Sequence, residues 1–207
     1  MDTFDLIADE RRSLADTLAG LTEDQWQQPS RCDGWRARDV LAHLVFPFEV
    51  SIPSLLVRMA RARLDFNRMS DTAARDDRRT PAELLAVYRA NVTSRFTPPG
   101  AGPEAPLTDT VVHGADILAP LGVAHDVTAE ARATVLGFVV SRTATRGFVA
   151  RGRVDGLCFT ATDLDRSWGS GPVVSGPAVP LASAICGRTA AVADLAGDGL
   201  DTFRARL

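Results

Sequence analysis

The hydrophobic pattern is clearest near the start of the chain, in residues 4–18. The apolar side chains there recur at helical spacing, and Asp, Glu and Arg fill the positions between them. These apolar residues are Phe4, Ile7, Leu14 and Leu18. Such a pattern gives a helix one apolar face and one charged face. Residues 4–18 therefore predict an amphipathic helix that packs against a core.

Residues 22–38 interrupt the pattern and predict a turn region. Pro29 and the Asp33-Gly34 pair are residue types that favour turns. Asp33 also has a side chain that is suited to lead into a helix. Two tryptophans of this region are expected to fill the core, namely Trp26 and Trp35.

A second helix is predicted from Val40 towards Leu64, because apolar residues again follow helical spacing. Pro47 and Pro53 lie inside it, and each removes a backbone donor and clashes with the preceding turn. We therefore expect a kink or a break into two helices. The polar residues 67–79 are expected to form a mobile connection.

The third helix has the best start signal in the chain. Thr80 and Glu83 have the spacing of a capping box, and Pro81 stands at the first helical position. Residues 97–106 are rich in proline and glycine, which excludes a helix or a central strand. A fourth amphipathic helix is predicted over residues 107–118. Four helices with such connections predict a bundle.

The pattern changes in the last part of the chain. Residues 126–150 predict one helix of about twenty residues. Residues 157–164 alternate apolar and polar side chains, and residues 171–176 form a β-prone run bounded by glycines, so both predict strands. A helix near 179–185, a further short helix and a final turn complete a small α/β module. The prediction is therefore an α+β fold with two domains, residues 1–124 and 125–207.

Composition and charge exclude several classes of function. The chain has 207 residues, 45% of them hydrophobic and 24% charged, and a formal net charge of -3. Its arginines are scattered among acids, so nucleic-acid binding is not expected. The first residues are acidic where a secretory signal needs basic ones, and no run of about 18 apolar residues follows. We therefore expect a cytoplasmic protein that does not bind or cross a membrane.

The cysteines do not predict a structural metal site. Cys32, Cys158 and Cys186 are far apart, odd in number and free of close Cys pairing, so buried free thiols are expected. The basic residues are almost all arginine and alanine is abundant, which fits a high-GC genome.

Three side chains with metal-binding chemistry fall on predicted helices. Asp109 and His113 are four residues apart, so a helix presents both on one face. His43 lies on the apolar side of the second helix, where it faces the bundle interior. Two facing helices would then join two imidazoles and a carboxylate. A surface hydrogen bond between Asp109 and His113, with a satisfied core histidine at position 43, is the alternative interpretation.

Such a ligand set favours catalysis over a structural role. Three protein ligands leave positions open for water or substrate, as in catalytic zinc sites. Nickel, iron or manganese also accept nitrogen and oxygen ligands. The third histidine, His125, follows Pro120 and Gly122 and is predicted to be a solvated linker residue.

Short sequence motifs in both halves of the chain occur in an order that is known from one family. These motifs are Asp33-Gly34-Trp35, Asp39-Val40-Leu41-Ala42-His43-Leu44, Asp109-x-x-x-His113 with Asp116-Ile117, Thr162-Asp163 before Trp168-Gly169, and Gly187-Arg188 before Leu195-x-Gly197-Asp198-Gly199. The chain thereby resembles the mycothiol-dependent maleylpyruvate isomerase family. The resemblance implies a DinB-like four-helix bundle over residues 1–124 and a domain similar to a sterol carrier protein over residues 125–207.

The resemblance also implies a ligand set for zinc or another divalent transition metal. In that family a histidine on the second helix and a Glu-x-x-x-His pair on the fourth bind zinc, which implies His43, Asp109 and His113 here. The acid in this chain is aspartate, one methylene shorter, and the shorter reach is expected to shift or weaken binding.

An essential arginine near the C-terminus of the family implies that Arg188 is a catalytic and cofactor-binding residue. A guanidinium suits bidentate contact with a carboxylate of the thiol or the substrate. The alternative is an arginine that caps a helix or pairs with Asp194 or Asp198.

The implied function is a mycothiol-dependent, metal-assisted transferase or isomerase. Its partners would be mycothiol and a small electrophilic substrate, and the enzyme would be a monomer or a homodimer. Two alternatives stay open. One is a metal-free protein that binds a small molecule without turnover. The other is a zinc-dependent hydrolase that uses metal-bound water.

Overall fold

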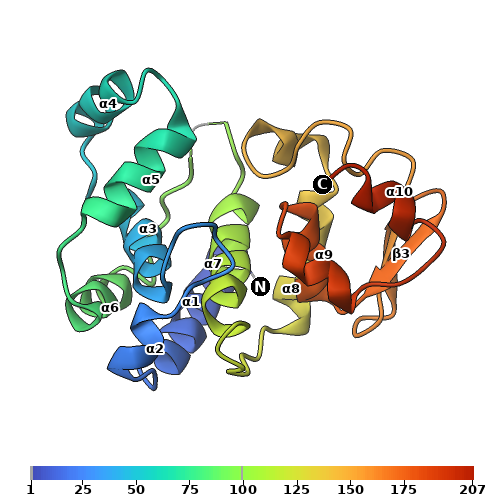
Figure 1. Cartoon of the computed structure of the whole chain (residues 1–207), viewed down its shortest axis with the longest axis horizontal. Helices are drawn as coiled ribbons and strands as arrows, with labels where there is room; N and C mark the ends of the chain where they lie inside the picture. The colour runs from blue at the N-terminus through green and yellow to red at the C-terminus, as the bar shows by residue number, and fades with distance from the viewer. Residues whose placement is uncertain (1, 99) are drawn as a thin grey trace.

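The computed structural model describes residues 2–98 and 100–207, and it has the α+β fold that the sequence predicts (Figure 1). Its α-helices are α1 (Thr3–Leu18), α2 (Glu23–Gln27), α3 (Ala37–Glu49), α4 (Ile52–Arg61), α5 (Phe66–Asp76), α6 (Pro81–Ala90), α7 (Glu104–Leu118), α8 (Ala129–Val139), α9 (Ala178–Ile185) and α10 (Leu200–Arg204). The 3₁₀ segments are η1 (Arg142–Arg146) and η2 (Thr189–Asp194), and the strands are β1 (Cys158–Ala161), β2 (Arg166–Gly169) and β3 (Val173–Gly176).

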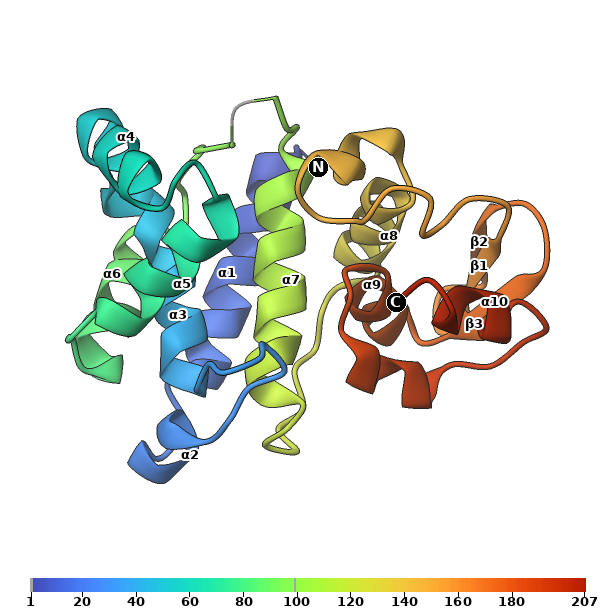
Figure 2. The same ribbon diagram turned by 45° about the horizontal axis from the view of Figure 1, so that its top comes forward.

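The four predicted helices of the first half form a bundle. Helix α1 contacts α6 and α7, and α3 contacts the same two helices from the other side. Figure 2 shows α7 on the side of the bundle that faces α8 and α9 of the second half of the chain. The helix that carries two of the three predicted metal ligands therefore lies where the two halves meet.

The break predicted at the two prolines is present. Pro47 lies in the last turn of α3, where it removes the backbone donor to the carbonyl four residues earlier, and the helix ends two residues later. The chain is extended at Val50 and Ser51, and Ser51 caps α4 by accepting from the backbone N–H of Ser54. Pro53 then stands in the first turn of α4, a position that tolerates proline.

Two predictions about the connections are wrong. Residues 67–79 are mostly helix α5, which is capped by Asp65 and packs against α3. Met69 and Ala74 are buried, so a small apolar stripe was sufficient to hold a polar segment against the bundle. The turn region also contains a short helix, α2, with a capping box between Thr22 and Gln25. Helix α3 begins at Ala37, close to the predicted Val40, and Asp39 rather than Asp33 supports its start by accepting from the Arg36 backbone N–H.

The long helix predicted over residues 126–150 is shorter in the structure. Helix α8 ends at Val139, and the 3₁₀ segment η1 follows it. Residues after Val139 include several β-branched and hydroxyl side chains, which have weak helix propensity. These local preferences outweigh the apolar spacing that predicted a single helix.

The sheet has three short strands in the order β2-β1-β3. Strand β1 pairs with β2 antiparallel and with β3 parallel. Phe159, Ala161 and Val174 face the core, which gives β1 and β3 the alternation that made them predictable. Strand β2 is exposed along most of its length and has no such alternation, so its sequence did not predict it.

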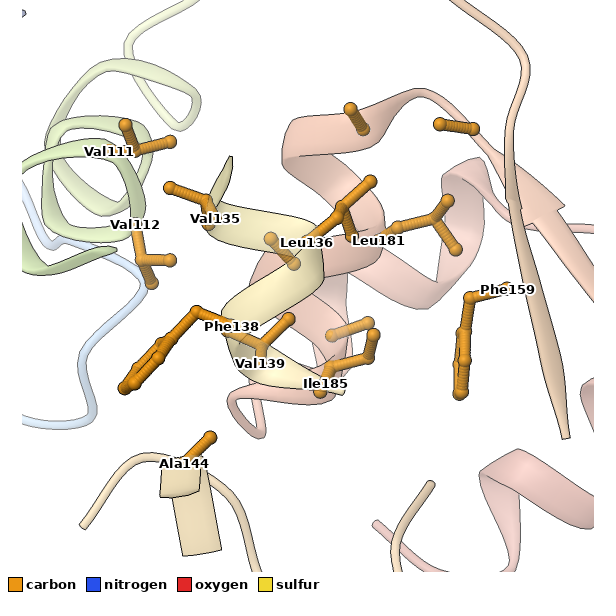
Figure 3. Packing of buried hydrophobic residues seen from close by; sticks show 14 of the residues in the cluster. Val111, Val112, Val135, Leu136, Phe138, Val139, Ala144, Phe159, Leu181 and Ile185 are labelled. Atoms are coloured by element: carbon orange, nitrogen blue, oxygen red, sulfur yellow. The ribbon is translucent and has the colours of Figure 1, made fainter. Parts of the chain in front are cut away.

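One hydrophobic cluster joins the two halves. It includes Val111 and Val112 of α7, and in Figure 3 these face Val135 and Phe138 of α8. The same cluster extends through α9 to Phe159 of β1. Among residues 2–98 and 100–207, no helix combines the length and apolar character needed to cross a membrane.

Candidate metal centre

The structure brings His43, Asp109 and His113 together. His43 lies on α3, and Asp109 and His113 lie one turn apart on the facing surface of α7. One ligand atom of each residue lies within 4.8 Å of the other two. The centroids of the two imidazole rings are 4.8 Å apart, in an edge-to-face arrangement. The three side chains are thus close enough to hold a single ion.

Each histidine has its Nδ1 atom engaged by another side chain. The Ser70 hydroxyl on α5 lies 2.8 Å from Nδ1 of His43. The Asp116 carboxylate lies 3.0 Å from Nδ1 of His113. Metal-binding histidines commonly use one ring nitrogen for the ion and the other for a carboxylate, carbonyl or hydroxyl. Both rings therefore have Nε2 left for an ion, and Nε2 of His113 lies 3.9 Å from the Asp109 carboxylate.

Burial and neighbouring charges give the two histidines different protonation states. Burial, with the positive charges of His113 and Arg188, lowers the pKa of His43 to about 3. Burial also opposes a charge on His113, but hydrogen bonding to Asp116 and Cys32 and the charge of Asp116 outweigh it and raise its pKa to about 10. His43 is neutral at pH 7, and His113 holds a proton in the absence of a metal.

Asp109 lies on the side of the centre that borders solvent. Its side chain is 31% exposed, and one carboxylate oxygen lies 3.9 Å from Nε2 of His113. Burial raises the pKa of this carboxyl, against the attraction of His113, Arg188 and Arg11. The centre thus combines two imidazoles from a packed interior with a carboxylate that borders solvent.

Arg188 reaches this centre from the second half of the chain. Gly187 has a φ of 98°, which glycine adopts readily, and the chain turns there after α9. The Arg188 guanidinium then binds the Asp116 carboxylate, with Nη2 at 2.7 Å and Nε at 3.1 Å from Oδ2. Its partner is thus Asp116, and the predicted alternatives of Asp194 or Asp198 are wrong, since Asp198 accepts from the Val173 backbone instead.

Cys32 is a member of the centre that the sequence did not predict. Its thiol donates to Asp116 at 3.1 Å and lies 3.7 Å from Nδ1 of His113. Cys32, His113 and Asp116 form a second group of possible metal ligands. Nη2 of Arg188 lies within 3.8 Å of a ligand atom of each of these three residues. The guanidinium therefore supplies the positive charge at this second group. All three cysteines are free, as expected. They are only partly buried, whereas buried thiols were expected.

The Asp33-Gly34-Trp35 loop closes one wall of the centre. The Trp35 ring lies 5.4 Å from the His43 ring, and its Nε1–H donates to Asp71 of α5 at 2.7 Å. Gly34 has a φ of 73°, and a Cβ there would collide with the guanidinium of Arg75. Trp26 is buried in the bundle as predicted, whereas Trp35 is only partly buried and lies at the site.

His125 lies outside both groups of possible ligands. Its Nδ1 atom is 3.2 Å from the hydroxyl of Thr17, at the end of α1. It is partly buried rather than solvated, because the α7–α8 connection packs back against α1. Burial lowers its pKa.

Comparisons with known proteins bear on the family and the fold of the chain. Residues 7–106 match the family model of the mycothiol maleylpyruvate isomerase N-terminal domain, a span that contains His43 and ends before Asp109. No curated protein matches the chain significantly by sequence.

Two similar solved structures are the mycothiol-dependent maleylpyruvate isomerase and a histidine-to-alanine variant of it. They are 14% and 13% identical to this chain, each with a TM-score of 0.61, and the alignments cover 95% of this chain and 92% of the other. Residues 7–106 thus match the family of the mycothiol maleylpyruvate isomerase N-terminal domain, and the chain shares the fold of the mycothiol-dependent maleylpyruvate isomerase along both halves.

Proposed function

We propose that this protein is a mycothiol-dependent enzyme that uses a divalent metal ion in a thiol transfer or isomerisation. The ion, zinc or another transition metal, is held by His43, Asp109 and His113. Mycothiol is the thiol cofactor, and the substrate is a small electrophile. The match of residues 7–106 to the family model and the similar solved structures support the use of mycothiol.

The arrangement of the imidazole nitrogens is the observation that best supports a metal. Ser70 contacts Nδ1 of His43, and Asp116 contacts Nδ1 of His113. Each imidazole therefore has Nε2 left as the nitrogen that can bind an ion. Aspartate and histidine are zinc ligands, and three of them leave a position open in a catalytic site. The partial exposure of Asp109 leaves the centre open to solvent on that side.

The metal supplies one kind of chemistry, since a dication stabilises a thiolate and lowers the pKa of a thiol. The protein's own residues supply binding and orientation. Arg188 carries a fixed positive charge beside His113, where its guanidinium is suited to hold a carboxylate of cofactor or substrate. The Trp35 ring packs against His43 and limits the access of water on that side.

Metal analysis of protein purified without a His tag tests the proposal first. We expect close to one equivalent of a transition metal, or uptake of one equivalent of added zinc. A protein that holds no metal and gains none on adding zinc would instead be a metal-free binding protein.

A second experiment separates thiol chemistry from hydrolysis. The cobalt-substituted protein is titrated with mycothiol, and thiolate ligation gives a strong near-ultraviolet charge-transfer band. A spectrum that mycothiol leaves unchanged would favour a metal hydrolase that activates water. The matched control is the Arg188→Ala variant, in which we expect the same band at higher mycothiol concentration.

A further inference from the structure

The Asp116 side chain contacts three other side chains of the centre, although it is outside the proposed ligand set. It lies one turn after His113 on α7 and is fully buried, with 0% exposure. Its carboxylate meets donors from three parts of the chain: His113 on α7, Cys32 in the turn region and Arg188 in the second half. Its backbone carbonyl accepts from the N–H of Arg31.

We infer that Asp116 is a positioning residue for both His113 and Arg188. By accepting a hydrogen bond from Nδ1–H of His113, it leaves Nε2 as the nitrogen available to a metal ion on the side of Asp109. By binding the Arg188 guanidinium, it holds the C-terminal half against α7 at the same centre. This inference rests on the proposed function and deepens it.

The tautomer follows from the chemistry of the neighbours of Nδ1. Asp116 is 3.0 Å from this atom and, when ionised, can only accept hydrogen bonds. Arg188 can only donate, and its Nη2 is 3.3 Å from the same atom. Nη2 lies closer to the Asp116 carboxylate, at 2.7 Å, so the Arg188 donor is directed at Asp116 rather than at the imidazole. Nδ1 of His113 therefore carries a hydrogen and donates to Asp116.

The position of Arg188 follows from the same carboxylate. Three contacts of 2.7 to 3.2 Å link its Nε and Nη2 atoms to Asp116, and Nη1 donates to the Cys186 carbonyl at 3.1 Å. In this orientation the guanidinium stands beside Cys32 and His113. Without Asp116, Arg188 has no other carboxylate partner among the described residues to hold it there.

The test compares zinc affinity in Asp116→Asn with that of the wild type, by competition with a chromophoric chelator. Asparagine keeps the volume but loses the charge, so we expect zinc affinity to fall by about ten- to a hundredfold. The matched control is Asp163→Asn, which removes the charge that pairs with Arg132, away from the centre, while its amide oxygen can still accept from the Ala178 N–H. We expect the control to keep wild-type affinity.

A second variant separates the two roles. Arg188→Ala should bind zinc within about threefold of the wild type, because Asp116 still orients His113. Equal affinity in folded Asp116→Asn and wild type would overturn the inference, as would an equal loss in Asp163→Asn.

Nitrogen-15 spectra of the imidazoles in the wild-type zinc protein decide the matter if Asp116→Asn does not fold. A hydrogen on Nδ1 of His113 and zinc at Nε2 support the inference, and the reverse assignment contradicts it. A wild-type protein that takes up no zinc at all would overturn the proposed function itself, and the role of Asp116 towards a metal with it.

Discussion

A histidine on the apolar face of a helix is ambiguous at the scale of one residue. A ligand must be held in one orientation and must also lie beside other ligands. Ser70 holds His43, Asp116 holds His113 and Thr17 contacts His125, but within the described part of the chain His125 lies outside both groups of possible ligands. The three histidines of the chain thus have unequal prospects as ligands.

Substitution of the histidines should reproduce this difference. His43→Ala removes one of three donors, so we expect loss of stoichiometric metal in a protein that stays folded. His125→Ala is the control and should retain the metal content of the wild type. Metal analysis after desalting and a circular dichroism spectrum provide the two measurements. Full metal content in His43→Ala would show that the ligand set is wrong.

The aspartate at position 109 offers a second test at this scale. Asp109→Glu restores the longer acid of the family and keeps a carboxylate, so we expect metal binding to be retained. Asp109→Asn removes the charge, and we expect zinc affinity to fall by at least about tenfold. Isothermal titration with zinc compares the two variants. A tighter complex with asparagine than with glutamate would contradict the role of the carboxylate.

At the scale of elements, helix α5 shapes the centre from outside the four main helices. Ser70 contacts His43, and the next residue, Asp71, accepts from Trp35 and Arg75. One helical turn therefore holds both a proposed ligand and the loop that packs against it. A segment expected to be a mobile connection is thus part of the support of the site.

The Ser70 hydroxyl can be tested against a neighbour on the same helix. Ser70→Ala removes the partner of Nδ1 of His43, and we expect zinc affinity to fall by about tenfold. Thr72→Ala is the control, because its hydroxyl bonds only to the Arg68 carbonyl on the exposed side of α5. Chelator competition measures both. An equal effect in the two variants would point to general loosening of α5.

The capping box of α6 makes a separate prediction about stability. Thr80 accepts from the Glu83 backbone, and Glu83 accepts from the Thr80 backbone at 2.7 Å. Thr80→Ala should lower the free energy of unfolding by about 1 kcal/mol, and Thr80→Ser should leave it nearly unchanged. Urea denaturation followed by circular dichroism measures both. Equal losses in the two variants would assign the effect to packing of the threonine methyl.

At the scale of the whole molecule, the two halves share one hydrophobic cluster. Leu6 and Ile7 of α1 and Val112 of α7 belong to the same cluster as Leu136 of α8. Buried Glu10 of α1 also accepts from Thr128, the capping residue of α8. The predicted division at residues 124 and 125 falls in the connection between α7 and α8, but α7 packs on both sides of it.

A single substitution in the second half should therefore destabilise both halves. Leu136 is fully buried, and Leu136→Ala should lower the free energy of unfolding by about 2 to 5 kcal/mol. Single-tryptophan versions that keep Trp26 or Trp168 report on the two halves by fluorescence. We expect both midpoints to shift together. A shift confined to Trp168 would show that the halves unfold as independent domains.

Much of the secondary structure follows from local rules. Apolar periodicity located α1, the two prolines located the break at Pro47 and Pro53, and the capping box at Thr80 located α6. Each of these signals depends on residues only a few positions apart. The same rules missed α5 and β2, whose polar residues are ordered by contacts with α3 and β1. Local propensity carries little information about such contacts.

The candidate site divides in the same way. The sequence by itself determined which side chains have metal chemistry and that Asp109 and His113 share one helical face, since that spacing is local. Only the tertiary structure placed His43 opposite them, engaged both Nδ1 atoms and brought Arg188 to Asp116. These contacts join residues up to 72 positions apart, and their geometry depends on how α3, α5, α7 and α9 pack.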